Sequence, residues 1–485
     1  MVSKSKITRS KKTQPEFKLS IGIKDFGPIN SGKIDLKPLT IFIGPNNSGK
    51  SYAAVLINAI QNANPYVNNT LSPFRIVSIW SDSGTEYLFE IPSEKIRLDF
   101  KKAIEDASES SLESELKNKF RKLFQSYIDI IYIKNLQQRI SNSFSTTLSD
   151  LIRKGTEKAT LHIETSKINI ILDLCENKIH RRSDNILEIL ESYKGIFIEL
   201  SESKGKKHHF EDKILKIIIK FLDDNFRNIV ESSFYLPAAR AGILQAHNAI
   251  VSSLIRDAAH VGIRKFEIPK LSEVLAIFLD SIVSMTEKKG DFFDLACELE
   301  KELIQGEITI SRTGEFKLPE IKYKTSGMEI SIQRASSSVS ELAPIILYMK
   351  HYLRPGSILI IEEPEAHLHP NNQYILAKYL VRLVRRNVHI VITTHSDYLL
   401  EQINNSIFRS ELKEQKKSTN DDDVYVKKDE VAVYLFKPNE KKGGFNIEPV
   451  SITDDEGISD DEFSNIVKCI YDESVSIQKR LHSKK

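Results

Sequence analysis

Residues 44–51, GPNNSGKS, constrain the fold more than any other stretch of this chain. They match the phosphate-loop pattern G-x-x-x-x-G-K-[ST] at every fixed position. The pattern requires a β-strand before the loop and an α-helix after it. KPLTIFI is short and β-rich, and SYAAVLINAI carries apolar residues at helical spacing. The order of strand, loop and helix predicts an α/β fold that binds phosphate here, whereas the alternative is a glycine-rich turn with an exposed lysine.

The residue types of this loop suit the binding of a nucleoside triphosphate. Gly44 and Gly49 permit backbone angles and a close approach that a side chain would forbid, so that successive N–H groups can point at phosphate oxygens. Lys50 is predicted to reach the β- and γ-phosphates, and the Ser51 hydroxyl is predicted to ligate Mg²⁺. The predicted cofactors are therefore ATP and Mg²⁺. The residues predicted to bind the nucleotide are Gly44, Pro45, Asn46, Asn47, Ser48, Gly49, Lys50 and Ser51.

Length and composition narrow the class of protein further. At 485 residues the chain is too long for one ordinary core, which predicts a large domain with a substantial insertion. The net charge of +3 is small, so any contact with nucleic acid is expected from a local patch. The three cysteines lie far apart, which argues against a disulfide framework or a zinc finger. No apolar run has membrane-spanning length and no signal-peptide core is present, so we expect a cytoplasmic protein without membrane contact.

Three segments are predicted in the first half of the chain. Residues 1–16 form a basic, flexible tail, with contact to nucleic acid as the alternative. Residues 17–94 form the N-terminal lobe with the phosphate loop. Residues 95–231 are predicted to be a mostly helical insertion, because long amphipathic and charged segments fill them. Their heptad pattern is not sustained, which argues against a long coiled-coil arm.

Three more segments are predicted in the second half. Residues 232–410 form a C-terminal lobe, in which continuously apolar strands alternate with helices, as in a parallel sheet covered on both faces. Residues 411–430 are predicted to be a charged loop. Residues 431–485 are predicted to form a hairpin of VAVYLF and FNIEPV, followed by a terminal helix.

Acidic residues and a histidine follow two strands of the predicted parallel sheet. The apolar strand 358–361 delivers Glu362 and Glu363 to its C-terminal end, where a parallel sheet binds its ligands. Glu362 is predicted to hold the water shell of Mg²⁺ and Glu363 to polarise the attacking water; a strand that ends in solvated charge is the alternative. After the strand 389–394, His395 is predicted to donate a hydrogen bond to the γ-phosphate.

The order of GPNNSGKS, a serine-rich segment, ILIIEEPEAHLHP and VITTHSD resembles the ABC-class AAA ATPases. That class includes SMC-type repair proteins, recombination proteins of the RecF kind and the overcoming-lysogenization-defect nucleases. Within it, EEPEAHLHP and SSFYLPAARAG are most similar to the ATPase subunits of the Septu and PARIS antiphage systems. The resemblance covers about residues 17–62 and 232–405. It implies an ABC-ATPase head that forms a homodimer or higher oligomer, with each nucleotide between one protomer's phosphate loop and its partner's signature segment.

The resemblance also implies a role for each matching residue. Glu362 corresponds to the metal-binding acid of the Walker B motif, Glu363 to the catalytic glutamate and His395 to the switch histidine. The resemblance therefore implies that the catalytic residues are Glu363, His395 and Lys50, and that the metal ligands are Ser51 and Glu362.

The serine-rich segment matches the signature at Ser336, Ser337 and Ser338. Relatives usually carry at least one glycine here, and this chain has Ser338. Ser338 and Glu341 also form an S-x-x-E capping box at the start of a predicted helix. Capping and binding of the partner's phosphate both use this helix N-terminus, so both interpretations stay open.

Three further features suggest other chemistry. The pair His367 and His369 has metal-binding spacing, but no third ligand is near, so the family's dimer-contact loop after Walker B is preferred. Arg240 can reach a phosphate or a partner, or form an ordinary salt bridge. The acidic cluster of residues 454–462 suggests a nuclease, yet it contains a capping-box pattern and no strand ending in D-x-D.

The predicted function is a Mg²⁺-dependent ATPase that acts as the sensor or regulatory subunit of an antiphage defence complex. DNA or a phage protein would be its trigger, and a separate nuclease or toxin its effector. About ninety residues follow His395, which is short for the Toprim nuclease domain of relatives, so no intrinsic nuclease is expected. The alternatives are a nucleotide-locked oligomeric scaffold with little hydrolysis and an SMC- or RecF-like DNA-repair ATPase.

Overall fold

The structure of the chain is a computed structural model that describes residues 18–63, 75–80, 86–91, 132–185, 232–247, 250, 271–313, 318–415, 423–453, 457–458, 472–475 and 477. The predicted tail at residues 1–16 lies outside these ranges. So do most of the predicted terminal helix and most of the acidic cluster at residues 454–462.

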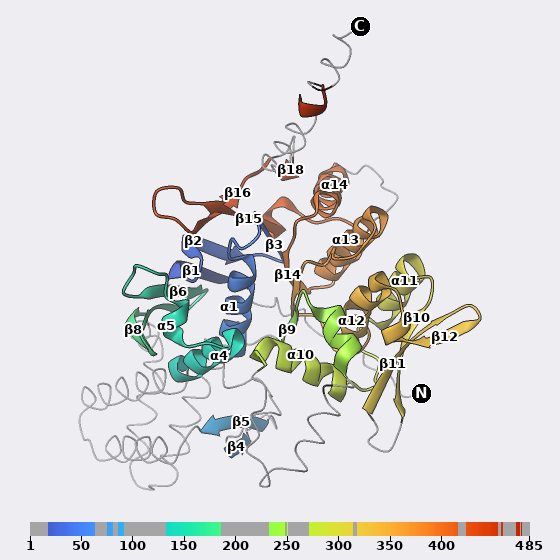
Figure 1. The fold of residues 1–485 in the computed structure, drawn as a ribbon, viewed down its shortest axis with the longest axis horizontal. Coiled ribbons are helices and arrows are strands. Elements are labelled where there is room, and N and C mark those ends of the chain that lie inside the picture. Colours follow the sequence, from blue (N-terminus) through green and yellow to red (C-terminus); the bar gives the residue numbers. More distant parts are fainter. Residues whose placement is uncertain are drawn as a thin grey trace, which may run out of the picture.

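A mixed sheet of eleven strands forms the centre of the molecule (Figure 1). Five strands at one end of it, β15, β3, β14, β13 and β9, run parallel to one another. The strand β3, from the first tenth of the chain, lies between β15 and β14, which both come from the last quarter of the chain. In spatial order the strands are β8 Lys178–Asp184, β7 Asn169–Cys175, β6 Ala159–Thr165, β1 Leu19–Phe26, β2 Ile29–Leu36, β16 Phe445–Val450, β15 Val431–Pro438, β3 Leu39–Ile43, β14 His389–Thr393, β13 Ile358–Glu362 and β9 Ser233–Leu236.

Helices cover both faces of the parallel strands, as the continuously apolar sequences predicted. In β13, Ile358 and Ile360 point into one core, which contains α1, whereas Leu359 and Ile361 point into a second core, which contains α12, α13 and α14. This alternation follows from the two-residue period of a strand. The helices are α1 Lys50–Asn62, α4 Lys134–Phe144, α5 Leu148–Leu151, α10 Glu273–Ser284, α11 Phe293–Leu303, α12 Ser337–His351, α13 Pro370–Arg385 and α14 Asp397–Glu414. None of the helices in the described ranges is long and apolar enough to cross a bilayer.

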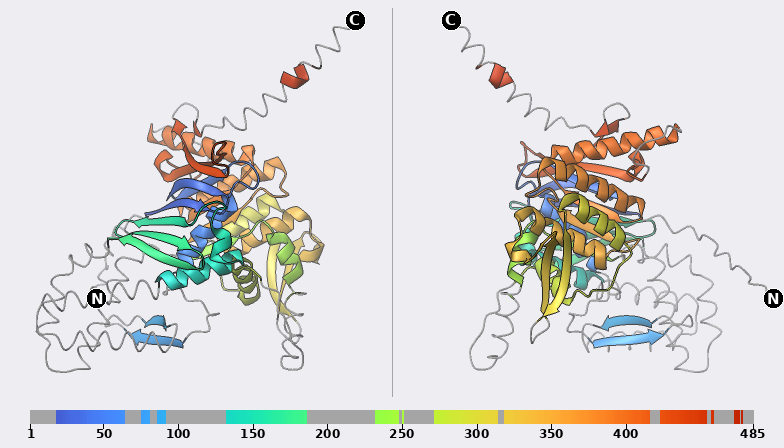
Figure 2. Two further views of the ribbon diagram at one scale, coloured as in Figure 1. Left: turned by 60° about the vertical axis from the view of Figure 1, so that its left-hand side comes forward. Right: turned by 90° about the vertical axis from the view of Figure 1, so that its right-hand side faces the viewer.

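Smaller sheets accompany the central one. Figure 2 shows the sheet of β10 (Glu307–Thr313), β11 (Leu318–Thr325) and β12 (Met328–Ser331) beside the helices of the C-terminal lobe. The strands β4 (Arg75–Trp80) and β5 (Glu86–Ile91) pair with each other in an antiparallel manner. The predicted hairpin is confirmed as the antiparallel pair β15 and β16.

Three strands occur where a mostly helical insertion was predicted. Within residues 95–231, the described part contains α4 and α5, but also β6, β7 and β8, which extend the central sheet through β1. In β6, the buried residues Ala159, Leu161 and Ile163 alternate with partly exposed ones, which is the strand period. The prediction missed these strands because it followed the charged amphipathic segments around them, and because their partner β1 lies more than a hundred residues earlier.

The predicted charged loop at residues 411–430 is corrected at its start, while residues 416–422 lie outside the described ranges. The helix α14 continues to Glu414, and residues 423–430 are fixed to the C-terminal lobe. Arg382 Nε lies 2.6 Å from Asp423 Oδ2, and Arg385 forms an ion pair with Glu430. Val424 and Val426 are buried, which removes their apolar surface from water. This segment therefore packs against the lobe, although its charged composition suggested a loop without such contacts.

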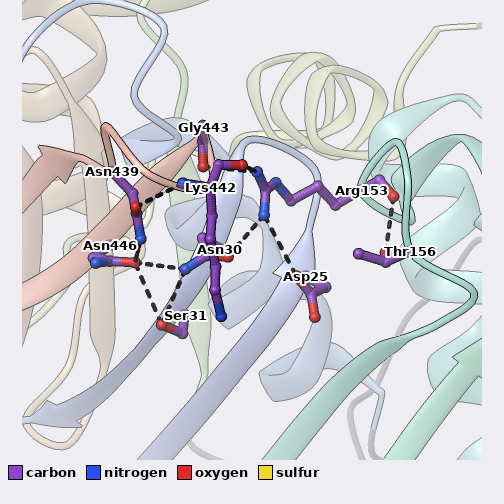
Figure 3. A network of polar contacts seen from close by, with 9 residues as sticks. All are labelled: Asp25, Asn30, Ser31, Arg153, Thr156, Asn439, Lys442, Gly443 and Asn446. Carbon is purple, nitrogen blue, oxygen red and sulfur yellow. Dashed lines mark hydrogen bonds and ion pairs between the residues drawn. The ribbon is translucent and has the colours of Figure 1, made fainter.

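A cluster of turns holds the N-terminal strands against the C-terminal hairpin (Figure 3). The guanidinium of Arg153 donates to Asn30 Oδ1 at 2.7 Å and to the main-chain oxygen of Gly443 at 2.7 Å. It also donates to the main-chain oxygen of Lys442 and lies 3.6 Å from Asp25 Oδ1. One arginine therefore joins the β1–β2 turn, the loop before β6 and the β15–β16 turn, around a cavity of about 380 Å³.

The imidazole of His389, at the start of β14, is expected to make folding sensitive to acid. Burial lowers the pKa of His389 to about 4, from an ordinary value of 6.5. The unfolded chain therefore takes up this proton at a higher pH than the folded chain. The stability linked to His389 is present above pH 6.5 and is lost as the pH falls towards 4. We expect this group to lower the free energy of unfolding by about 3 kcal/mol across that window.

Chemical denaturation of the parent and of His389→Gln between pH 7 and pH 4.5 measures this effect. The variant is expected to lose part of the pH dependence, whereas His180→Gln, at an exposed histidine of β8, is expected to keep all of it. Parallel curves for the parent and His389→Gln would contradict the expectation.

Candidate functional site

The C-terminal ends of β3, β14 and β13 lie side by side at one edge of the sheet. In the register of these strands, Thr393 is the partner of both Phe42 and Glu362. The pairing continues past the strands, because the N–H of Thr394 donates to Phe42 O at 3.0 Å and the N–H of Glu363 donates to Thr393 O at 2.9 Å. The phosphate loop, the acidic pair and the histidine segment therefore leave the sheet at neighbouring positions.

The phosphate loop has the backbone that its glycines predicted. Gly44 and Gly49 have φ angles of 131° and 103°, and Asn47 has a φ of 60°. A Cβ atom at Gly44 would lie 2.7 Å from the main-chain oxygen of Phe436, and one at Gly49 would lie 2.9 Å from Cγ1 of Ile29. Both positions require glycine, because a side chain would be strained in angle and would collide with its neighbours. The helix α1 begins at Lys50, directly after Gly49, so the last two residues of the motif form its first turn.

The side chain of Lys50 folds back over the phosphate loop. Its Nζ donates to the main-chain oxygens of Gly44 and Pro45, both at 2.8 Å, and the residue is buried. Burial lowers the pKa of Lys50, while the carboxylates of Glu363 and Glu365 oppose this change. The ammonium group is therefore already at the loop, within the electrostatic influence of the segment after β13. Ser51, on the first turn of α1, is exposed.

The two adjacent glutamates at the end of β13 have different environments. Glu362 is buried, and its Oε2 accepts a hydrogen bond from the N–H of Ala238 at 3.1 Å. Glu363 is partly exposed and has a left-handed backbone with a φ of 44°, which is uncommon for a residue with a side chain. The change of backbone angle directs the two carboxylates differently, which suits two separate roles.

The third glutamate of this segment, Glu365, is a residue whose function sequence reasoning did not identify. Its Oε1 accepts hydrogen bonds from the N–H of His395 at 2.6 Å and from Thr394 Oγ1 at 2.8 Å. Burial raises the pKa of Glu365, and these hydrogen bonds oppose the rise. Glu365 therefore fixes the segment of His395 to the turn after β13. The only sequence signal was a further acid two residues after the adjacent pair.

His395 lies at the exit of β14, as predicted, with an exposed side chain. Partial burial and the ammonium of Lys50 lower the pKa of its imidazole, while the Glu363 carboxylate opposes the change. The imidazole is therefore neutral at neutral pH and can donate one hydrogen bond. Lys50 and Glu363 act electrostatically on the imidazole of His395, and the segments of all three residues leave neighbouring strand ends, so the structure brings these three predicted residues to one site.

The structure does not bring the serine-rich segment to that site within one chain. Ser336 and Ser337 are exposed at the N-terminus of α12, and among the described residues no hydrogen bond joins them to the phosphate loop. The predicted capping box of Ser338 and Glu341 is wrong. Ser336 is the cap, and its Oγ accepts from the N–H of Val339 at 3.4 Å, because the chain is still extended at Ser336 and becomes helical only after it.

Two of the further candidates also have structural roles. Arg240 is completely buried and lies 3.1 Å from Glu341 Oε2, so the structure favours the salt bridge over contact with a phosphate. His369 caps α13, since its Nδ1 accepts from the N–H of Asn371 at 3.3 Å, whereas His367 is exposed.

The loop conformation, the buried lysine and the neighbouring strand ends define an α/β P-loop protein with a head of the ABC-ATPase type, as the sequence predicted. A family model described as "AAA ATPase domain" matches residues 19–400, and the chain belongs to this family.

Solved structures of SMC heads are also similar to this chain. An SMC head bound to the C-winged helix domain of ScpA is 10% identical, with a TM-score of 0.40 over 90% of this chain and 98% of that chain. The SMC head domain from Thermotoga maritima is 11% identical, with a TM-score of 0.35 over 90% and 100%. An SMC head with an extended coiled coil, bound to the C-terminal domain of ScpA and derived from Pyrococcus furiosus, is 11% identical, with a TM-score of 0.39 over 94% and 99%. These TM-scores are too low to support the assignment, which rests on the family match. No curated protein matches the chain.

Proposed function

We propose that the chain is a Mg²⁺-dependent ATP hydrolase whose reaction takes place where β3, β14 and β13 end. The observation that carries this proposal is that the phosphate loop with Lys50, the segment of Glu363 and the segment of His395 leave the neighbouring ends of β3, β13 and β14. A glycine-lined loop, an ammonium group and a carboxylate at one sheet edge are the parts that phosphoryl transfer to water requires.

The residues of the site fit a triphosphate and a magnesium ion. Gly44 and Gly49 leave space that a Cβ would fill, and Lys50 lies against the loop with its charge available to the phosphates. The Ser51 hydroxyl and the Glu362 carboxylate are hard oxygen donors of the kind that Mg²⁺ prefers. When bound, the ion would neutralise charge that develops on the phosphates.

The remaining side chains have assigned tasks in the proposed reaction. Glu363 orients the attacking water and accepts its proton. His395, neutral at neutral pH, donates a hydrogen bond to the γ-phosphate. Glu365 keeps the main chain of His395 in place through its 2.6 Å hydrogen bond.

We further propose that two chains close around two nucleotides, with α12 of one chain facing the phosphate loop of the other. The exposed Ser336 and Ser337 at a helix N-terminus support this arrangement, since such an end favours anions. Pro45, Asn46 and Asn47 of the phosphate loop are exposed as well, so both halves of the composite site are accessible.

ATP-dependent dimer formation tests this arrangement. The molar mass measured by light scattering is expected to double when ATP is added to Glu363→Gln, because this variant retains the nucleotide. Combining it with Ser337→Glu is expected to keep the protein monomeric, since a carboxylate would face the partner's triphosphate. Combining it with Ser183→Glu, at an exposed serine of β8, is expected to leave dimer formation intact. The same mass with and without ATP would contradict the arrangement.

In the cell, we propose that this ATPase is the sensor or regulatory subunit of an antiphage complex, with DNA or a phage protein as trigger and a separate nuclease or toxin as effector. This role is supported by the resemblance of the segments EEPEAHLHP and SSFYLPAARAG to those of antiphage ATPases. Protection against phage by the chain and its effector, lost in Lys50→Ala, is the expected result.

Two other functions predict different results. A nucleotide-locked scaffold, suggested by Ser338 in place of a glycine, would bind ATP tightly and release no phosphate. A DNA-repair ATPase would rescue the sensitivity of a repair-deficient strain to DNA damage.

A further inference from the structure

The guanidinium of Arg240 holds the main chain of both adjacent glutamates. Arg240 follows β9, and its side chain is completely buried. Nη1 donates to the main-chain oxygen of Glu362 at 2.6 Å, and Nη2 donates to that of Glu363 at 3.1 Å. These two carbonyls flank the point at which the backbone turns into the left-handed conformation of Glu363. The arginine therefore fixes the turn from which the Glu363 carboxylate projects.

The opposite side of the same guanidinium contacts helix α12. Its Nε donates to the main-chain oxygen of Glu341 at 3.1 Å and lies 3.1 Å from Glu341 Oε2. Glu341 is itself buried, and its helix carries the exposed serines at its N-terminus. One buried side chain therefore joins the turn after β13 to the helix that is proposed to face the partner's nucleotide.

Stability alone is a weak explanation for this arrangement. Replacing a buried ion pair by apolar residues of similar volume often leaves a protein equally stable or more stable. An arginine offers a planar set of donors with fixed directions, which no apolar pair reproduces. A left-handed residue with a side chain is strained and persists only when its surroundings hold it. The contacts of Arg240 meet this need at Glu363.

We propose that Arg240 is a positioning residue, which acts through the main chain of Glu362 and Glu363 and holds their turn in fixed relation to helix α12. Because its side chain is completely buried, Arg240 is proposed to act without contacting the nucleotide or the attacking water. It determines where the Glu363 carboxylate lies. This inference rests on the proposed function for its catalytic consequence, but its structural consequence can be measured without turnover.

Two variants at this position test the proposal. Arg240→Lys keeps the charge but cannot reach both carbonyls and Glu341 together. The double variant Arg240→Met/Glu341→Leu removes both charges, so that no unpaired charge stays buried. This variant is therefore expected to fold. In both variants we expect kcat for ATP to fall by about 10- to 100-fold, because small displacements of a catalytic group have effects of this size. The KM for ATP is expected to stay within about threefold, since Lys50 and the loop are unchanged.

A second buried ion pair on α12 supplies the matched control. Lys350 Nζ lies 2.8 Å from Glu300 Oε1, with both side chains buried, and both also hydrogen-bond the main chain of Ile308 in β10. The pair Lys350→Met with Glu300→Leu is expected to change thermal stability about as much as the Arg240 pair. Its kcat is expected to stay within about twofold of the parent, because the links that are lost join α12, α11 and β10 and lie away from the turn after β13.

Amide hydrogen exchange of the segment 358–370 provides a readout that does not depend on activity. Exchange of this segment is expected to accelerate by about 10-fold or more in Arg240→Lys, because the hydrogen bond from Glu363 to Thr393 loosens, and to stay unchanged in the control pair.

Several results would overturn the inference. The first is amide exchange and kcat in the Arg240 variants that equal those of the Lys350/Glu300 control variant. The second is a raised KM for ATP with an unchanged kcat. The third is unfolding of both Arg240 variants while the control variant stays folded. Failure of the proposed function is distinct: the parent and Glu363→Gln would then release phosphate at equal rates, and the exchange experiment would still decide the role of Arg240.

Discussion

Replacing Glu363 by glutamine is expected to lower the rate of ATP turnover by about 10²- to 10⁴-fold, which corresponds to roughly 3 to 5 kcal/mol of activation free energy. Glutamine has the shape of glutamate but cannot accept the proton of the attacking water. The main-chain hydrogen bonds of this residue, to Thr393 and from Arg240, involve no carboxylate and are retained. Steady-state release of phosphate with Mg²⁺ and saturating ATP measures the loss.

Nucleotide binding separates a catalytic role from a structural one at this position. Titration with ATP is expected to give the parent's affinity within a few fold, because Glu363 is not expected to bind the phosphates. Glu448→Gln, at an exposed glutamate of β16, removes the same charge away from the site and is expected to keep the parent's rate. If Glu363→Gln and Glu448→Gln release phosphate equally fast, Glu363 is not the base.

Replacing Lys50 by alanine is expected to affect both binding and turnover. A hydrogen bond to a charged group contributes about 1.5–3 kcal/mol, so the affinity for ATP is expected to fall by about 10- to 150-fold. Loss of a donor that stabilises charge in the transition state adds about 10²-fold or more in kcat. Calorimetric titration and phosphate release measure the two effects separately.

The free protein is expected to tolerate the loss of Lys50. Its ammonium contacts the carbonyls of Gly44 and Pro45, and these lie in a loop that borders solvent. Lys50→Arg is a useful comparison, because it keeps the charge but places it in a larger, planar group. A stabilisation of Lys50→Ala by ATP equal to that of the parent, in thermal unfolding, would show that this lysine does not bind the nucleotide.

The phosphate loop could be predicted because all of its determinants are local. Gly44, Gly49 and Lys50 lie within eight consecutive residues, and the flanking strand and helix have clear periodicities. The acidic pair after β13 and His395 after β14 could be placed near this loop, since carboxyl ends of neighbouring parallel strands share one edge of a sheet. Each of these inferences needs only a strand and the few residues directly after it.

Contacts between distant segments could not be predicted in the same way. Arg240 reaches the carbonyl of Glu341 across 101 residues and that of Glu362 across 122 residues. A main-chain oxygen has no sequence signature, so the sequence left open whether this arginine binds a phosphate or forms an ion pair. The strands β6, β7 and β8 escaped prediction for a related reason, because their place in the sheet depends on pairing with β1.

The cap of α12 shows the limit of a local rule. Three consecutive serines stand at the start of this helix, and the S-x-x-E pattern selects Ser338. The structure selects Ser336, because the helix then begins early enough to bury Val339 and to direct Glu341 at Arg240. Packing against the rest of the lobe therefore decides between caps that the sequence leaves nearly equivalent.

The position of β3 between β14 and β15 has a consequence for biosynthesis. A nascent chain that has emerged from the ribosome only as far as α1 already contains the entire phosphate loop, but neither strand beside β3 has yet been translated. Pairings between such distant segments form late in folding. Competence to bind a nucleotide is therefore acquired near the completion of synthesis, so that a truncated translation product would carry the motif without a working site.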